Sequence, residues 1–364
     1  MKRILTLALA SALALPALAH AEKGSPLWLR HQQISPDGSQ IAFCYKGDIY
    51  TVPTAGGQAL RLTSNAAYDG TPIWSPDSRS LAFSSDREGS KDVYIVKADG
   101  SGLRRLTYSS EKEVPVAFLD GSTLLFQSYV MPDVKDGMYP WDWFVQTYSL
   151  DLSKTIARPK LYGAYPMLMP SLRGGEILYT DVKGYEDIWR KHAVSPVTRD
   201  IWLRSKDGKH TKLTTFGGED RNAVWDSKGG FYYLSEREGS FNVYHRDAAT
   251  AAAADKKITS FTKNPVRFLS IASNGTLCYG FDGEIYTQTP GGQPTKVNVS
   301  IVRDQEESAI NPETIRDGVS SFAVAPSNKE IAFIVHGDVF VTHTEYGTTK
   351  RLTSTPEEER DVDF

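Results

Sequence analysis

The sequence predicts an all-β fold, a six-bladed β-propeller built from four-stranded repeats. One observation is a turn motif that recurs seven times along the 364 residues, each time followed by short β-rich segments. A second is an aromatic residue at a fixed spacing from the end of the preceding repeat. Repeats of about 40–50 residues with four short strands each are the signature of propeller blades.

The clearest repeat runs from Ile73 to Gly100 and continues into Leu106-Thr107. Its turn Ser75–Ser78 contains Pro, which fixes φ, and Asp, which can hydrogen-bond its own backbone. A first strand ends at Trp74, and the other three are expected at Leu81–Ser85, Val93–Val96 and Leu103–Leu106. The repeat therefore reads as one antiparallel module.

The same turn position recurs through the chain. The seven turns are Ser35–Gly38, Ser75–Ser78, Leu119–Gly121, Leu172–Gly175, Asp226–Gly229, Ser273–Gly275 and Ala325–Asn328. Most repeats end in a Leu-Thr or Ile-Thr pair. Twelve residues after the Leu of this pair comes an aromatic residue, as in Leu62 to Trp74 and Leu213 to Trp225. We interpret this aromatic as a core residue packed between neighbouring sheets.

The repeats predict the domain organisation. Residues 22–302 contain six repeats and form the six-bladed propeller, and the polar, acidic segment 303–318 is a linker. Residues 319–364 contain a seventh repeat and end at Phe364, the residue expected to open an eighth. A strand without partners would leave an open edge. We therefore expect a fragment, in which 319–364 is the incomplete start of a second propeller.

Residues 1–21 have the pattern of a signal peptide. Lys2 and Arg3 precede an apolar segment, and Ala19-His20-Ala21 resembles a cleavage site. We expect an exported protein, periplasmic or extracellular, with no membrane span after cleavage. The net charge is −3 and no Lys/Arg block stands out, so nothing indicates nucleic-acid binding.

Two repeats contain insertions, which in repeat proteins form loops on one face. The third has Tyr139, Trp141 and Trp143 close together. These aromatics either form a contact surface for peptide or a partner domain, or they begin a core strand.

The fourth repeat has two Asp-Ile-Trp elements, at Asp187 and Asp200, and the first is followed by Arg190, Lys191 and His192. This basic run is either a loop that contacts acidic groups or a solvated face.

The sequence lacks the familiar catalytic and metal-binding motifs. There is no Gly-x-Ser-x-Gly, His-Glu-x-x-His, Cys-x-x-Cys or P-loop sequence, and no histidine stands at a familiar ligand spacing. The sequence thus predicts no catalytic residue, no metal and no cofactor. Cys44 and Cys278 are expected as small buried hydrophobic residues, although an oxidising compartment also permits a bond.

The repeats resemble the WD-like or Tol-type propeller repeat: Leu-Thr, Trp-Ser-Pro-Asp-Gly, Ile-Ala-Phe-x-Ser and Asp-Ile-Tyr. Two longer segments, Tyr185–Leu203 and Ile331–Arg360, resemble the tricorn-protease-like serine peptidases in their exported bacterial form. This resemblance extends over the whole mature chain. It implies a non-catalytic N-terminal propeller region that filters or binds unfolded peptide or protein substrates.

The same resemblance implies further propeller blades, a PDZ domain and a catalytic core outside this chain, and a homo-oligomer is possible. No position here matches the family's catalytic motifs, so this chain alone is expected to be inactive. The alternative is a stand-alone periplasmic protein-binding propeller of the Tol-system type. That family has an α/β domain before its propeller, whereas here the first repeat follows the signal peptide closely.

Overall fold

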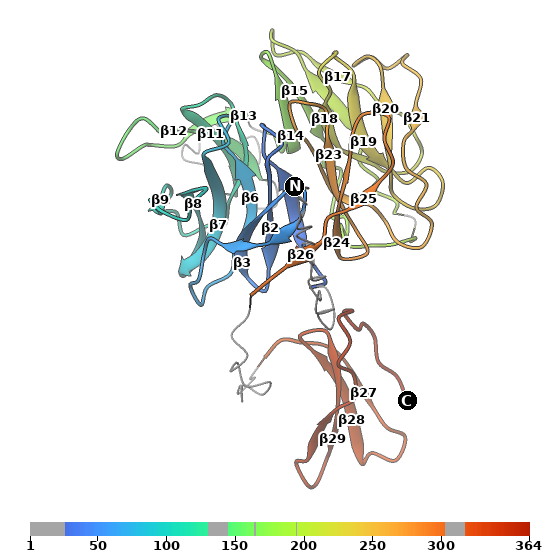
Figure 1. The fold of residues 1–364 in the computed structure, drawn as a ribbon. Helices are drawn as coiled ribbons and strands as arrows, with labels where there is room; N and C mark the ends of the chain where they lie inside the picture. Colours follow the sequence, from blue (N-terminus) through green and yellow to red (C-terminus); the bar gives the residue numbers. More distant parts are fainter. Residues whose placement is uncertain (1–25, 130–144, 164, 194, 303–316) are drawn as a thin grey trace, which may run out of the picture.

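The computed structural model describes residues 26–129, 145–163, 165–193, 195–302 and 317–364. Within these residues the fold is all-β, without a helix, and it contains seven four-stranded antiparallel sheets and one two-stranded sheet. Each four-stranded sheet is assembled from strands in sequence order. Figure 1 shows the seventh sheet, in red, apart from the other six.

The first sheet contains β1 (Arg30–Ile34), β2 (Gln40–Tyr45), β3 (Asp48–Pro53) and β5 (Leu60–Arg61). The second contains β6 (Asp69–Trp74), β7 (Ser80–Glu88), β8 (Ser90–Lys97) and β9 (Arg104–Arg105). The third contains β10 (Glu113–Phe118), β11 (Thr123–Ser128), β12 (Gln146–Asp151) and β13 (Lys160–Gly163). The fourth sheet contains β14 (Leu168–Arg173), β15 (Glu176–Thr180), β16 (Ile201–Arg204) and β17 (His210–Lys212). The fifth contains β18 (Asp220–Trp225), β19 (Phe231–Ser235), β20 (Asn242–Arg246) and β21 (Lys256–Lys257). The sixth contains β22 (Arg267–Ile271), β23 (Leu277–Phe281), β24 (Glu284–Gln288) and β25 (Thr295–Lys296). The seventh contains β27 (Val319–Val324), β28 (Glu330–Val335), β29 (Asp338–His343) and β30 (Thr349–Arg351), and β4 (Gly57–Gln58) pairs in parallel with β26 (Val299–Ser300).

The Leu-Thr pair at the end of a repeat has a local structural cause. The hydroxyl of Thr107 accepts a hydrogen bond from the backbone N–H of Val93 at 2.8 Å, where the β8–β9 ladder ends. Thr63 does the same for the N–H of Ile49 at 2.9 Å. A buried N–H without a partner would be costly, so the threonine stabilises the third strand of its sheet.

The predicted aromatic contact between neighbouring sheets is confirmed for Trp74 and Trp225. Trp74 and Trp225 are buried, and their indole N–H groups donate to carbonyls of the preceding sheet, at Gln33 (2.9 Å) and Ser171 (3.0 Å). In the sixth sheet the corresponding register position is held by Ile271, which pairs with Leu277 as Trp74 pairs with Leu81.

We call β1, β6, β10, β14, β18 and β22 the inner strands, because each is the first strand of its sheet and contacts inner strands of its neighbours. These contacts also connect the first sheet with the sixth. The N–H of Leu29 donates to the carbonyl of Gly283 at 2.9 Å, and the N–H of Ile34 donates to the hydroxyl of Ser270 at 3.1 Å.

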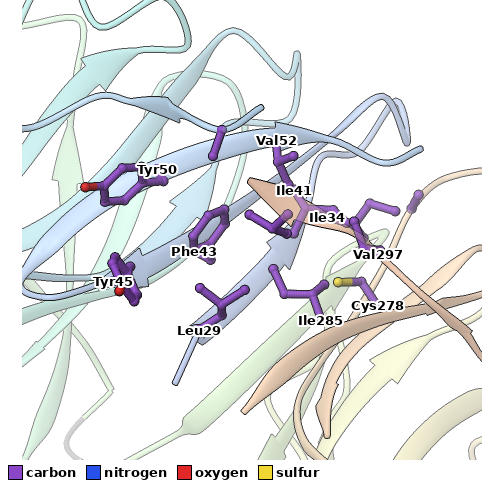
Figure 2. Packing of buried hydrophobic residues seen from close by; sticks show 13 residues of the cluster. Leu29, Ile34, Ile41, Phe43, Tyr45, Tyr50, Val52, Cys278, Ile285 and Val297 are labelled. Carbon is purple, nitrogen blue, oxygen red and sulfur yellow. The ribbon is translucent and has the colours of Figure 1, made fainter. Parts of the chain in front are cut away.

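A buried apolar cluster joins the same two sheets. Figure 2 shows Ile34 and Phe43 of the first sheet packed near Cys278 and Ile285 of the sixth. Cys278 and Cys44 lie in different clusters as separate thiols, and burial raises the pKa of each to about 12. They act as small buried hydrophobic residues, as the sequence predicted.

Candidate functional site

The inner strands share an irregularity that positions the site. In each of the six, the register with the second strand shifts. Five of them have a non-glycine residue with φ between 48° and 55° near this shift: His31, Thr71, Met169, Asn222 and Phe268. Such conformations cost free energy, and bulges change the direction of neighbouring side chains. Repeated strain of this kind points to a functional region.

Three of these strained residues line one small cavity. Met169 of β14, Asn222 of β18 and Phe268 of β22 surround a space of about 30 Å³ together with Arg221 and Arg267. A volume of about 30 Å³ is roughly the share of one water molecule in the liquid. The inner strands of the fourth, fifth and sixth sheets therefore converge here.

The insertion between β15 and β16 closes this region from one side. The guanidinium of Arg267 donates to three consecutive carbonyls of the insertion, at Ile188, Trp189 (2.6 Å) and Arg190 (3.1 Å). Arg221 donates to the carbonyl of Ile188 at 3.4 Å. A segment of the fourth sheet is thus held by arginines of the fifth and sixth.

Trp189 extends the contact to the first sheet. Its ring lies 5.7 Å from the ring of Phe268 and 6.5 Å from that of His31. The guanidinium of Arg30 lies over the ring of Trp189 at 4.9 Å and over that of Trp28 at 5.3 Å, within the range of cation–π attraction. We call this group the inner arginine–aromatic site; it consists of Arg30, Trp189, Arg221, Arg267 and Phe268.

Three guanidinium groups meet at this site, and one of them, that of Arg221, pairs with the carboxylate of Glu219 at 3.3 Å. Burial lowers the pKa of Arg267 to about 10, and the nearby charges of Arg221, Arg190 and Arg30 lower it further than Asp187 raises it. Burial and Arg30 also lower the pKa of His31 to about 4, so this ring is neutral at pH 7. In the described part of the chain, Arg30 has no ion pair with a carboxylate. Arg30, together with the rings of Trp189 and Phe268, is therefore suited to carbonyl oxygens, carboxylates and aromatic groups of a ligand.

The structure separates the three basic residues predicted in the insertion. Arg190 is buried and pairs with three carboxylates of this chain, those of Glu186, Glu219 (3.0 Å) and Glu236. Although burial opposes it, hydrogen bonding to these carboxylates raises the pKa of Arg190. The interpretation of the whole run as a solvated face is wrong for Arg190, because its donors are occupied inside the protein.

Lys191 and His192 are exposed. The ring nitrogens of His192 lie 3.0 Å from the carbonyl of Gly239 and 3.2 Å from that of Lys263. Contact of Lys191 and His192 with peptide stays a prediction. Tyr139, Trp141 and Trp143 lie outside the described residues, so their predicted role also stays a prediction.

Sequence reasoning missed Arg221, Arg267 and Phe268. One signal was available, because Phe268 stands two residues too early to be the aromatic that packs between sheets. The structure explains this break in the pattern, since Phe268 lies at the bulge and lines the cavity instead. The arginines had no signal, because their convergence depends on which sheets are neighbours.

Metal-binding groups and membrane-spanning helices are absent from the described residues. They contain no group of three or more His, Cys, Asp or Glu side chains arranged to hold a metal ion. The same portion of the chain has no helix long and apolar enough to cross a membrane.

Comparison with known proteins identifies the family. Residues 26–293 match the model of the tricorn protease N-terminal beta propeller domain. The chain belongs to this family. Its described sheets are therefore those of a propeller-type fold, and the chain is a tricorn-like N-terminal propeller region, in agreement with the resemblance seen in the sequence.

Curated relatives and a solved structure agree with the family model. Tricorn protease homolog 1 of Streptomyces coelicolor (strain ATCC BAA-471 / A3(2) / M145) is 23% identical over 343 residues, which cover 92% of this chain and 30% of the relative. A second tricorn protease homologue of that organism is 23% identical over 357 residues, covering 93% and 28%. The crystal structure of the tricorn protease has a TM-score of 0.62 and 18% identity, covering 91% of this chain and 32% of that one. The chain thus spans less than a third of these relatives.

Proposed function

We propose that this chain is the non-catalytic propeller region of an exported tricorn-like serine peptidase, and that it filters and binds peptides on their way to a catalytic core in another part of the protein. The observation that carries the proposal is the inner arginine–aromatic site in a chain of the tricorn propeller family. A positively charged, aromatic-lined region among the inner strands suits the carbonyls and side chains of an extended polypeptide.

In this proposal the six sheets between residues 22 and 302 are the blades of one ring, because the first sheet packs against the sixth. The insertion that contains Trp189 narrows the centre of the ring, so that unfolded chains are admitted and folded proteins are excluded. Residues 1–21 direct export, and 303–318 link the ring to a second propeller that begins at 319. Further blades, a PDZ domain, the serine-peptidase core and homo-oligomeric assembly belong to the parent protein.

One contact supports a second propeller placed next to the inner site. Arg360, which follows the seventh sheet, pairs with Asp187 of the insertion at 3.2 Å. This pair is largely exposed, so it contributes little to stability on its own. It nevertheless brings the segment after the linker to the insertion that holds Trp189.

The test measures binding of a fluorescently labelled, unstructured peptide to the purified chain by anisotropy. Arg30→Gln is expected to weaken binding about tenfold, since a charge-assisted contact is worth about 1.5–3 kcal/mol and tenfold corresponds to about 1.4 kcal/mol. Arg79→Gln, which makes the same change of charge at an exposed turn, serves as the control. Equal binding by both variants, or no binding by the unaltered chain, would contradict the proposal.

A further inference from the structure

The second and fifth sheets contain the same ion-pair arrangement. In the second, Arg87 donates to both carboxylate oxygens of Asp69 at 2.9 and 3.0 Å and to the hydroxyl of Ser85 at 2.9 Å. Its guanidinium lies 4.6 Å from the ring of Tyr94 and 5.7 Å from that of Phe83. The carboxylate of Asp69 is fully buried, so the arginine neutralises a charge that water cannot reach.

The fifth sheet repeats this arrangement. Arg237 donates to Asp220 at 3.4 Å and to Ser235 at 2.9 Å, and its guanidinium lies 4.8 Å from the ring of Tyr244 and 5.8 Å from that of Tyr233. The arginine stands two residues after the serine in both sheets.

The third sheet has every part of this arrangement except the arginine. Glu113 pairs with Ser128 in the strand register, as Asp69 pairs with Ser85 and Asp220 with Ser235. Phe126 pairs with Tyr148, as Phe83 pairs with Tyr94 and Tyr233 with Tyr244. Two residues after Ser128 the sequence has Val130, which lies outside the described residues.

A pocket lies where the guanidinium would be. It has a volume of about 270 Å³ and is lined by Thr107, Glu113, Phe126, Ser128, Tyr148 and Pro159, among others. Glu113 is 3% exposed, and within the described residues no basic side chain pairs with it. Its carboxyl instead interacts with the hydroxyl of Thr107, the N–H of Ser109 at 3.4 Å and the carboxyl of Asp92.

We propose that this pocket binds the guanidinium of an arginine side chain supplied by a peptide substrate, with Glu113 as the counter-charge and Phe126 and Tyr148 as the stacking surface. The peptide as the source of the arginine rests on the proposed function; the pocket itself does not. A planar guanidinium fits because arginine holds the equivalent place in both other sheets, and it stacks on aromatic rings better than an ammonium does.

In this proposal, binding of the guanidinium is coupled to release of a proton from Glu113. Burial raises the pKa of Glu113 to about 7, and the nearby charge of Asp92, itself paired with Arg105 at 2.8 Å, adds to this increase. Among the described residues, Tyr148 also faces Glu113, and it stays neutral because burial raises its pKa to about 12. A guanidinium that enters the pocket favours the carboxylate, so below pH 7 Glu113 releases its proton as arginine binds.

Isothermal titration of the chain with Nα-acetyl-arginine methylamide tests the pocket. We expect binding at least tenfold tighter than that of the citrulline analogue, which has the same shape without the charge, and tighter than that of the lysine analogue. At pH 6, titrations in buffers of different ionisation enthalpy should reveal release of close to one proton, and at pH 8 nearly none. Equal binding of arginine and citrulline analogues, or no change in protonation at pH 6, would overturn the proposal.

Two variants complete the test. Glu113→Gln should lose the arginine preference, whereas Glu111→Gln, an exposed neighbour with the same charge change, should keep it. Retained preference in a folded Glu113→Gln variant would overturn the pocket.

The pocket and the filter role fail separately. Loss of arginine preference while arginine-free peptides still bind in an Arg30-dependent way would overturn only the pocket. Binding of the capped arginine by a chain that binds no longer peptide would overturn only the filter role.

Discussion

The second and third sheets both place a buried acid opposite a serine and a phenylalanine opposite a tyrosine, yet among the described residues only the acid of the second sheet has an arginine beside it. In the second, Arg87 occupies the space beside Asp69. In the third, a pocket of about 270 Å³ occupies the space beside Glu113. The comparison teaches that a repeated fold can form a binding site where one repeat lacks a side chain that another repeat has, because the residues that would surround that side chain are still present.

The largest effect is expected in the second sheet, where Arg87 occupies the space beside Asp69. Arg87→Ala should lower the free energy of unfolding by about 3–5 kcal/mol, because it leaves the fully buried carboxylate of Asp69 without its counter-charge. Urea denaturation followed by tryptophan fluorescence measures this loss. Arg79→Ala, in an exposed turn, is the control and should change stability by less than about 0.5 kcal/mol. A loss below about 1 kcal/mol for Arg87→Ala would show that the two sheets do not differ in the way described.

Glu113→Gln should instead raise the free energy of unfolding, and the size of this increase should depend on pH. The native pKa of about 7 lies above the usual value of this carboxyl, so the native state keeps the proton while the unfolded state releases it. Stability contributed by this group is therefore full below about pH 4 and is lost as the pH rises to 7. Denaturation at pH 8 should find the variant about 1–2 kcal/mol more stable than the unaltered chain, and at pH 4 the gain should vanish. A constant difference across this range would assign the effect to something other than the proton.

Thr107→Val and Thr63→Val give a smaller and finer comparison. Both remove a hydroxyl that accepts from a strand N–H, which is worth about 0.5–1.5 kcal/mol. Each hydroxyl also has a carboxyl partner, Glu113 for Thr107 and Asp48 for Thr63 at 3.5 Å. The bond from Thr107 favours the ionised form of Glu113, which becomes populated as the pH rises past about 7, so the loss for Thr107→Val should grow between pH 6 and pH 8. Parallel denaturation curves at the two pH values measure this growth. A loss that stays constant would mean that Thr107 has no part in holding the Glu113 carboxylate.

The arginines of the inner site differ from Arg190, which the sequence singled out, in the partners that surround their guanidinium groups. Arg190 is surrounded by carboxylates of its own chain, whereas Arg267 is held by backbone carbonyls and Arg30 by aromatic rings. A guanidinium already paired with three carboxylates has little capacity left for a ligand. The basic run in the sequence therefore indicated the insertion correctly, but it did not indicate which of its residues are available to a ligand.

The sequence by itself determined the all-β repeat, the turns, the Leu-Thr exits and the aromatic contact between sheets, because each depends on interactions within one repeat or with the next. It also indicated the tricorn family through the insertion and the segment after the linker. Only the tertiary structure decided that Arg190 is buried, that Arg221 and Arg267 converge on the segment of Trp189, and that Glu113 lines a pocket with no counter-ion among the described residues. These features either join side chains from different sheets or depend on which partner a side chain lacks. The spacing of residues within one repeat indicates neither the distance between side chains of different sheets nor the lack of a partner.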